Sequence, residues 1–269
     1  MSTTRESENG HDMVRPYDKM MAVFAQRTAA KCASFVIEHI RPTDRMLDVG
    51  CGVGFITLDF ARLVPQGQVI GIDISESDLA IARDAADAQG VKNVEFRQVD
   101  AYKLAETFEE NSFDIIHAHQ VLLHVSEPVK ILQQMRRLVK SRGYVASTDC
   151  AEVFTYPLLP AAEKQKAVWL ELARRRGAYG LGGRKNHEWA HSAGFDWSQI
   201  EVGTGSQQWY GEAVKEWAKG AGPSMRSLAL NSGMLTAEEY DEIEEDTLQW
   251  SERPESRVME LDGTILCRK

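Results

Sequence analysis

Cysteine is scarce in this chain, and its spacing gives no support to a metal site. The 269 residues include four cysteines, and no two of them stand in the Cys-x-x-Cys spacing of zinc knuckles and dithiol redox sites. The wide separation does not suggest a disulfide framework either. We therefore expect free, buried thiols and no bound metal, the four cysteines being Cys32, Cys51, Cys150 and Cys267.

Long apolar runs and positive charge are also in short supply. No window approaches the roughly 18 consecutive apolar residues of a membrane span, and residues 1–12 lack the apolar core of a secretory signal. The chain carries 31 Lys and Arg against 40 Asp and Glu, a formal net charge of −9 that repels a phosphate backbone. We therefore expect a cytoplasmic protein that neither enters a membrane nor binds nucleic acid.

The chain does contain an alternation of short apolar runs with helical patterns. Hydrophobic residues make up 43% of it, which is typical of a globular protein. The runs that are typical of buried strands cover residues 46–49, 68–73, 94–98, 113–118 and 144–148. Segments with helical spacing lie between them, at residues 55–63, 77–89 and 129–138. This alternation predicts parallel β-α-β units in an α/β fold.

The pattern changes after residue 148. Residues 161–176 are typical of one long helix, and residues 200–204 and 264–268 of the last two strands. A helical insertion separates these strands, and its final part opens with Thr236 and Glu239 in capping-box spacing.

These segments predict one domain with helical additions. Residues 1–15 are expected to form a flexible tail, and residues 16–269 the domain. Its core is expected at about residues 40–150, 195–210 and 260–269. Helical lid segments are expected at about residues 16–40, 153–190 and 211–255. The first of them is expected to contain one amphipathic helix over residues 17–39, and a break within it is left open.

A glycine loop follows the first predicted strand and opens a helix. Its spacing is Gly-x-Gly-x-Gly, at Gly50, Gly52 and Gly54, and glycine lets the backbone turn tightly and approach a ligand. Asp73 ends the second predicted strand, where its carboxylate could accept hydrogen bonds from both hydroxyls of a ribose. Together the loop and the acid predict a ligand that contains a nucleoside.

The charge near the loop favours S-adenosylmethionine over a dinucleotide. The dinucleotide pattern Gly-x-Gly-x-x-Gly would need glycine at the position of Phe55. Asp48 would repel a pyrophosphate, whereas it suits the ammonium and sulfonium of S-adenosylmethionine. A tight turn without a ligand would explain the glycines but would leave Asp48 and Asp73 unexplained.

These motifs resemble a known family. The stretches 47–54 and 69–75 are similar to those of class I S-adenosylmethionine-dependent methyltransferases, specifically the UbiE-like small-molecule branch. The resemblance implies a Rossmann-like methyltransferase fold, with a doubly wound, mostly parallel seven-stranded sheet whose last strand is reversed. It implies S-adenosylmethionine as the cofactor and a ligand crevice at the carboxyl ends of the strands.

The resemblance also implies which residues bind the cofactor. Residues 93–101 resemble the family's third strand, whose closing Asp-Ala pair meets the adenine, and residues 113–122 resemble its fourth strand, beside the methionine part of the cofactor. A tyrosine from the N-terminal helix closes over the cofactor in similar enzymes. The implied cofactor residues are Tyr17, Asp48, Gly50, Gly52, Asp73, Ile74, Asp100, Ala101, His117 and Gln120. Residues 153–250 match the family weakly, so no acceptor pocket can be transferred.

Two residues are candidates for catalysis. Alignment of nucleophile and methyl can supply much of the rate, and a base is needed only when the acceptor must lose a proton. His119 follows the fourth predicted strand and could be that base, or it could only position the methionine part of the cofactor. Asp149 directly follows the fifth predicted strand and could orient a substrate hydroxyl, or it could be a solvated loop acid.

The predicted function is methyl transfer to a small organic acceptor, with the acceptor atom left open. A nucleic-acid amino methyltransferase would carry an acidic or asparagine residue with prolines after the fourth strand, where this chain has His-Ala-His-Gln at 117–120. Two alternatives stay open: a non-methylating rearrangement or cyclisation that uses the sulfonium as a fixed charge, and a non-catalytic cofactor-binding subunit. The sequence leaves a homodimer open as well.

Overall fold

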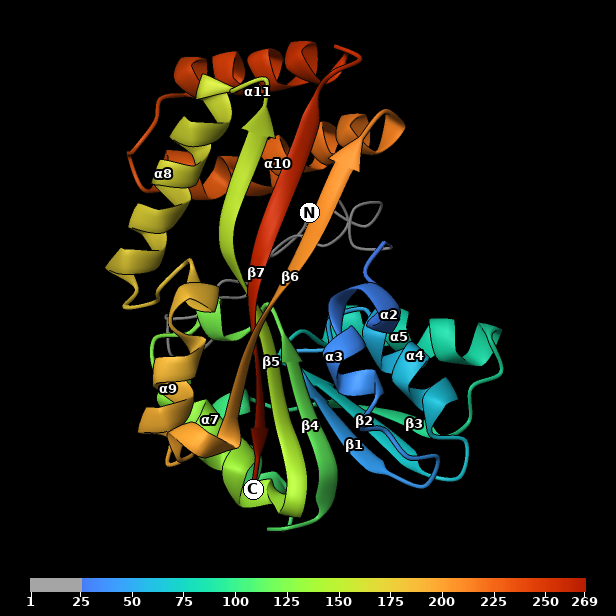
Figure 1. The fold of residues 1–269 in the computed structure, drawn as a ribbon. Coiled ribbons are helices and arrows are strands. Elements are labelled where there is room, and N and C mark those ends of the chain that lie inside the picture. Colours follow the sequence, from blue (N-terminus) through green and yellow to red (C-terminus); the bar gives the residue numbers. More distant parts are fainter. Residues whose placement is uncertain (1–25) are drawn as a thin grey trace.

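The computed structural model describes residues 26–269 and contains one seven-stranded sheet with helices on both faces (Figure 1). The strand order is β3-β2-β1-β4-β5-β7-β6. The first five strands pair in parallel, and β7 is antiparallel to both β5 and β6. The predicted doubly wound sheet with a reversed last strand is therefore confirmed. The strands are β1 Arg45–Val49, β2 Gln68–Asp73, β3 Val94–Gln98, β4 Phe113–His119, β5 Val139–Tyr156, β6 Ile200–Tyr210 and β7 Arg257–Arg268.

Helices cover the two faces of the sheet through separate apolar clusters. One cluster joins α2 (Ala29–Cys32), α3 (Ser34–Ile37) and α4 (Phe55–Leu63) to buried residues of the sheet, and α5 (Glu76–Ala88) packs beside α4. A second cluster joins α6 (Leu104–Thr107), α7 (Pro128–Leu138) and the segment around α9 (Asn186–Ser192) to residues of the central strands. Short 3-10 helices connect these elements at Ala101–Lys103, Leu122–His124, Gly182–Arg184 and Trp197–Gln199.

The N-terminal helical segment is broken, which its prediction allowed. Within the described residues the helix expected over 17–39 is two short helices, α2 and α3, separated by Ala33. Residues 17–25 lie outside the described part. None of the helices within residues 26–269 is both long enough and apolar enough to cross a membrane.

An upper lobe extends the sheet beyond its core (Figure 1). β5, β6 and β7 are longer than their predicted runs at 144–148, 200–204 and 264–268, and they continue past the ends of the other strands. The helices α8 (Pro160–Arg175), α10 (Glu212–Asn231) and α11 (Ala237–Ser251) pack against this extension. α11 begins with both hydrogen bonds of the predicted capping box in place, between Thr236 and Glu239.

The predicted lid segment 153–190 divides between two layers. Its first part, the end of β5 and α8, belongs to the upper lobe. Its last part reaches into α9, where Ala190 joins the main core cluster together with residues of α7. This segment therefore contributes to the core layer as well as to the lobe.

Candidate active site

The glycine loop between β1 and α4 has the backbone that its sequence predicts. Gly50, Gly52 and Gly54 have φ angles of 68°, 52° and 82°, in the left-handed region that side chains with a Cβ seldom adopt. A Cβ on Gly50 would lie 2.5 Å from Cγ2 of Val121, in the loop after β4. The loop therefore packs directly against the segment that follows β4.

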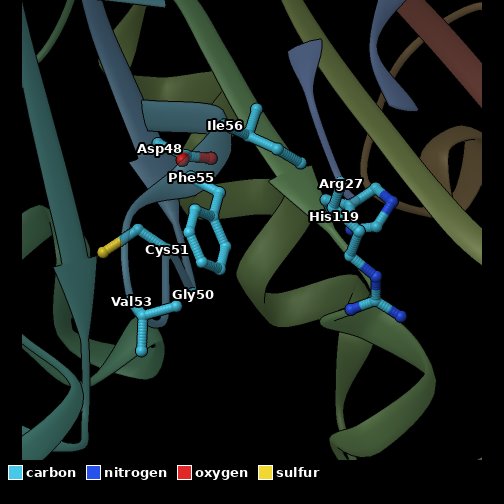
Figure 2. A pocket seen from close by; sticks show the side chains of 8 residues that line it. All are labelled: Arg27, Asp48, Gly50, Cys51, Val53, Phe55, Ile56 and His119. Atoms are coloured by element: carbon cyan, nitrogen blue, oxygen red, sulfur yellow. The ribbon is translucent and has the colours of Figure 1, made fainter. Parts of the chain in front are cut away.

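A cavity of about 420 Å³, counting its open mouth, lies beside this loop (Figure 2). The loop residues stand on one side of it, and Arg27 and His119 on the other. β1 lies between β2 and β4, so the cavity sits where the strand order reverses, the usual ligand position in open α/β sheets. Its lining residues are Arg27, Asp48, Gly50, Cys51, Val53, Phe55, Ile56 and His119.

Asp48 is held in the cavity wall by two hydrogen bonds. Its side chain accepts one from Thr57 Oγ1 at 2.6 Å and one from His117 Nδ1 at 2.8 Å. We assign Nδ1 as the donor because a carboxylate oxygen only accepts. His117 is fully buried, and its ring meets the ring of Phe60 edge-on at 5.0 Å. These contacts fix the direction of the Asp48 carboxylate.

The contact with Thr57 was not foreseen from the sequence. Thr57 lies on α4, which opens directly after the glycine loop, and it is fully buried. A threonine in the first turn of the helix after such a loop is the signal that could have identified it. The prediction placed His117 at the cofactor, whereas the structure places it behind Asp48 and outside the cavity lining.

Asp73, the last residue of β2, bonds to the backbone of the glycine loop. Its carboxylate accepts from the backbone N–H of Gly52 and from that of Ser75, both at 2.9 Å. Burial raises the pKa of Asp73 above its ordinary value, and the two backbone bonds oppose that change. Ile74 follows it and is 36% exposed. Asp73 thus ties the loop after β1 to the end of β2.

The predicted adenine residues follow the neighbouring strand. Asp100 comes shortly after β3, and its carboxylate accepts from the backbone N–H of Tyr102 at 2.8 Å, with Ala101 between them. Because β2 and β3 pair in parallel, their carboxyl ends lie at the same edge of the sheet. Asp73 and Asp100 stand at this edge, beside the glycine loop and outside the lining of the cavity.

His119 lines the cavity with a neutral imidazole. Burial, the charge of Arg27 and the neighbouring His117 lower the pKa of His119 well below its ordinary value, so the ring is neutral near pH 7. Its Nε2 atom is buried and has no hydrogen-bond partner among residues 26–269. The rings of His117 and His119 lie nearly parallel with their centroids 6.4 Å apart. The cavity wall thus offers an unused ring nitrogen next to Asp48.

Gln120 and Asp149 do not belong to the cavity lining, and their side chains bond to neighbouring strands and loops. Gln120, with a φ of 57°, accepts from Cys150 N and donates through Nε2 to both Glu260 and Asp262. Asp149 is fully buried and accepts from Leu123 N at 3.1 Å and from Ser147 Oγ at 2.8 Å.

Burial also raises the pKa of Asp149 to about 6. Its hydrogen bond from Leu123 N ties β5 to the segment after β4, whereas the bond from Ser147 stays within β5. Asp149 is therefore not a solvated loop acid. The remaining predicted site residue, Tyr17, lies outside the described residues.

Comparison with known proteins agrees with this geometry. Residues 40–205 match the family model described as a methyltransferase domain. The chain belongs to this methyltransferase family. It is 30% identical over 261 residues to an uncharacterised methyltransferase of Schizosaccharomyces pombe, with 91% of each chain covered. It is 28% identical over 266 residues to the proposed methyltransferase ltbC of Aspergillus luteorubrus, covering 90% of this chain and 92% of that one.

A shorter sequence match supports the same class, and two solved structures show the same fold. A ubiquinone biosynthesis O-methyltransferase of Acinetobacter baumannii is 36% identical over 101 residues, which is 38% of this methyltransferase and 41% of that enzyme. A proposed methyltransferase of Bacillus halodurans superposes with a TM-score of 0.60 at 18% identity, covering 89% of this chain and 99% of that one. The [4+2]-cyclase SpnF superposes with a TM-score of 0.50 at 20% identity, covering 91% and 80%. These two similarities show the fold, and the predicted methyltransferase class is confirmed.

Proposed function

We propose that this methyltransferase uses S-adenosylmethionine to methylate a small organic acceptor in the cavity beside His119. The observation that carries the proposal is the Asp48 carboxylate, fixed by Thr57 and His117 in the wall of a cavity formed by a glycine loop. A carboxylate there attracts the ammonium and sulfonium of this cofactor and repels a pyrophosphate.

The residues present fit the cofactor. Each oxygen of Asp73 accepts one backbone hydrogen bond, and a carboxylate oxygen can accept two, so both could also accept from a ribose hydroxyl. Asp100 and Ala101 lie at the next strand end, in the order expected for an adenine. The glycine loop brings backbone groups close to the cavity because no Cβ stands in the way. Bound S-adenosylmethionine would supply an activated methyl group.

His119 is proposed to position the reactants, and Asp149 to position the loop. A histidine whose pKa lies well below its ordinary value is a weak base near pH 7, although its free nitrogen can still accept a hydrogen bond from the acceptor. Asp149 holds the backbone of Leu123 and does not reach the cavity. Ile74 and Tyr17 stay predicted cofactor contacts, while a cytoplasmic location and a homodimer stay predictions from the sequence.

Calorimetric titration with S-adenosylhomocysteine tests the proposed cofactor. We expect Asp73→Ala to weaken binding at least tenfold, because charged hydrogen bonds are worth about 1.5–3 kcal/mol. The exposed Asp87→Ala is the matched control and should bind like the wild type. Unchanged affinity in Asp73→Ala, or stronger thermal stabilisation by NAD than by S-adenosylhomocysteine, would contradict the proposal.

Product mass tests the reaction itself. Methyl transfer adds one methylene to the acceptor and releases S-adenosylhomocysteine. A rearrangement or cyclisation releases none, and the shared fold of a cyclase makes this comparison worthwhile. The purified protein would be incubated with S-adenosylmethionine and a fractionated small-molecule extract. A converted molecule without S-adenosylhomocysteine release would favour the non-methylating alternative.

A further inference from the structure

Two carboxylates on β7 meet at the side chain of Gln120, which follows the cavity residue His119 in the chain. Glu260 Oε1 and Asp262 Oδ1 each lie 2.9 Å from the same atom, Nε2 of Gln120. Gln120 directly follows His119, and its own oxygen is held by Cys150 N. The side chain of Gln120 therefore draws the two acids together next to the residue that lines the cavity.

The two acids lie on the same face of the sheet as the cavity. Alternate residues of β7 share a face, so Glu260 and Asp262 stand between Leu266, in the core cluster of α2 and α4, and Val258, in the lobe cluster. The same two clusters border the cavity, since Ile56 belongs to the first and Phe55 packs against the second (Figure 2).

The acid pair and the cavity residue Arg27 act on the same thiol, that of Cys32. Burial, the largest cause, raises the pKa of the Cys32 thiol to about 11. The charges of Asp262 and Glu260 also raise this pKa, and the charge of Arg27, which lines the cavity, lowers it. Among the described residues, the charges that act on Cys32 are thus two carboxylates and one guanidinium.

Two buried donors on β6 lie on the same face as the acid pair, and neither has a partner among the described residues. Gln207 pairs with Glu260 and Trp209 pairs with Val258, so both lie on the face that carries the acids. Nε2 of Gln207 and Nε1 of Trp209 are buried and make no hydrogen bond to the part of the chain that the structure describes, and Trp209 is only 3% exposed. An unpaired buried donor is costly, so these N–H groups point to a ligand that supplies an acceptor.

We propose that the methyl acceptor is a small amine that also carries an oxygen, bound between His119 and this wall. Its ammonium meets Glu260 and Asp262, and its oxygen accepts from Trp209 or Gln207. One of the two carboxylates takes a proton from the ammonium. The freed nitrogen lone pair then forms the bond to the methyl carbon as the bond from that carbon to sulfur breaks and S-adenosylhomocysteine leaves. A carboxylic acid is disfavoured because the acid pair repels it. This inference rests on the proposed function, since it assigns an acceptor class to the same cavity.

Matched ligands test the acceptor class on protein saturated with S-adenosylhomocysteine. One set is phenylethanolamine, phenylethane diol and mandelate, and the second is aminopropanol, propane diol and lactate. Each set keeps its carbon frame and changes only the end group from amine to hydroxyl to carboxylate. Calorimetry should find the amine bound at least tenfold more tightly than the acid in one set or both. Equal binding of amine and acid, or no binding of either amine, overturns the inference.

Variants test the named residues. Glu260→Gln and Asp262→Asn should each weaken amine binding about tenfold and leave affinity for S-adenosylhomocysteine unchanged, which also reports correct folding. The exposed Glu201→Gln on β6 removes the same charge and should change neither affinity. Trp209→Phe keeps the ring and loses the donor, so it should weaken phenylethanolamine and spare phenylethylamine, which has no oxygen.

The outcomes separate this inference from the proposed function. Amine affinity that persists in both acid variants, with S-adenosylhomocysteine still bound, overturns the acceptor assignment alone. Failure of the wild type to bind S-adenosylhomocysteine overturns the proposed function itself.

Discussion

Replacing Asp149 by asparagine should stabilise the protein near neutral pH. The carboxyl is fully buried, and burial raises its pKa from 3.8 to about 6. The folded state therefore holds this proton more tightly than the unfolded chain does. The stability that the group contributes is full below pH 3.8 and is lost as the pH rises through about 6.

The magnitude follows from that difference in proton affinity. At about 1.4 kcal/mol for each tenfold change, the ionised carboxylate costs about 3 kcal/mol of unfolding free energy above pH 6. An asparagine carries no charge, can accept from Leu123 N and can donate to Ser147 Oγ. Because the amide makes weaker hydrogen bonds than a carboxylate, the expected gain is about 1–3 kcal/mol.

Urea denaturation of the wild type and Asp149→Asn, at several values between about pH 5 and pH 8, measures this effect. The two stabilities should converge as the pH falls, because the wild-type carboxyl is then protonated as well. Asp87→Asn, an exposed change of the same kind, should stay within about 0.5 kcal/mol of the wild type. If Asp149→Asn were less stable than the wild type near pH 7.5, the charge of this carboxylate would be stabilising and the reasoning would be refuted.

Two further substitutions test the cavity wall. Thr57→Val should weaken S-adenosylhomocysteine binding about tenfold by titration, because Asp48 loses a hydrogen bond that fixes its direction, while Thr43→Val at an exposed position should not. His119→Ala should lower turnover at saturating cofactor by less than about tenfold if the neutral ring only positions the reactants. A loss of about a hundredfold or more that shrinks at high pH would instead identify His119 as a base.

The cofactor end of the site could be predicted because its determinants are local in the chain. A glycine loop between a strand and a helix, with an acid at the end of the next strand, specifies its own backbone through glycine φ angles and strand ends. Neighbouring parallel strands then bring Asp48, Asp73 and Asp100 to one edge of the sheet. The motif needs no information from distant parts of the sequence.

The upper part of the site could not be predicted because its determinants are distant. Gln120 lies next to His119 in sequence, yet its amide donates to carboxylates 140 and 142 positions away. The extension of β6 has no apolar alternation to reveal it, and Gly205 and Ser206 become strand only by pairing with β7. The role of Asp149 could not be predicted for the same reason, because its partner Leu123 lies in another loop.

The charge change during methyl transfer separates the role of Asp48 from that of His119. The positive charge of the donor disappears as the methyl leaves, so a carboxylate that attracts this charge stabilises the bound ground state at least as much as the transition state. Asp48→Asn is therefore expected to raise KM for S-adenosylmethionine about tenfold or more and to change kcat less than about threefold.

Comparing the affinities of Asp48→Asn for S-adenosylmethionine and for S-adenosylhomocysteine shows which positive charge of the cofactor Asp48 contacts. Equal weakening of both identifies the ammonium that they share, whereas a larger loss for S-adenosylmethionine identifies the sulfonium. A large fall in kcat with KM unchanged would contradict a role in binding and would place Asp48 in the chemical step.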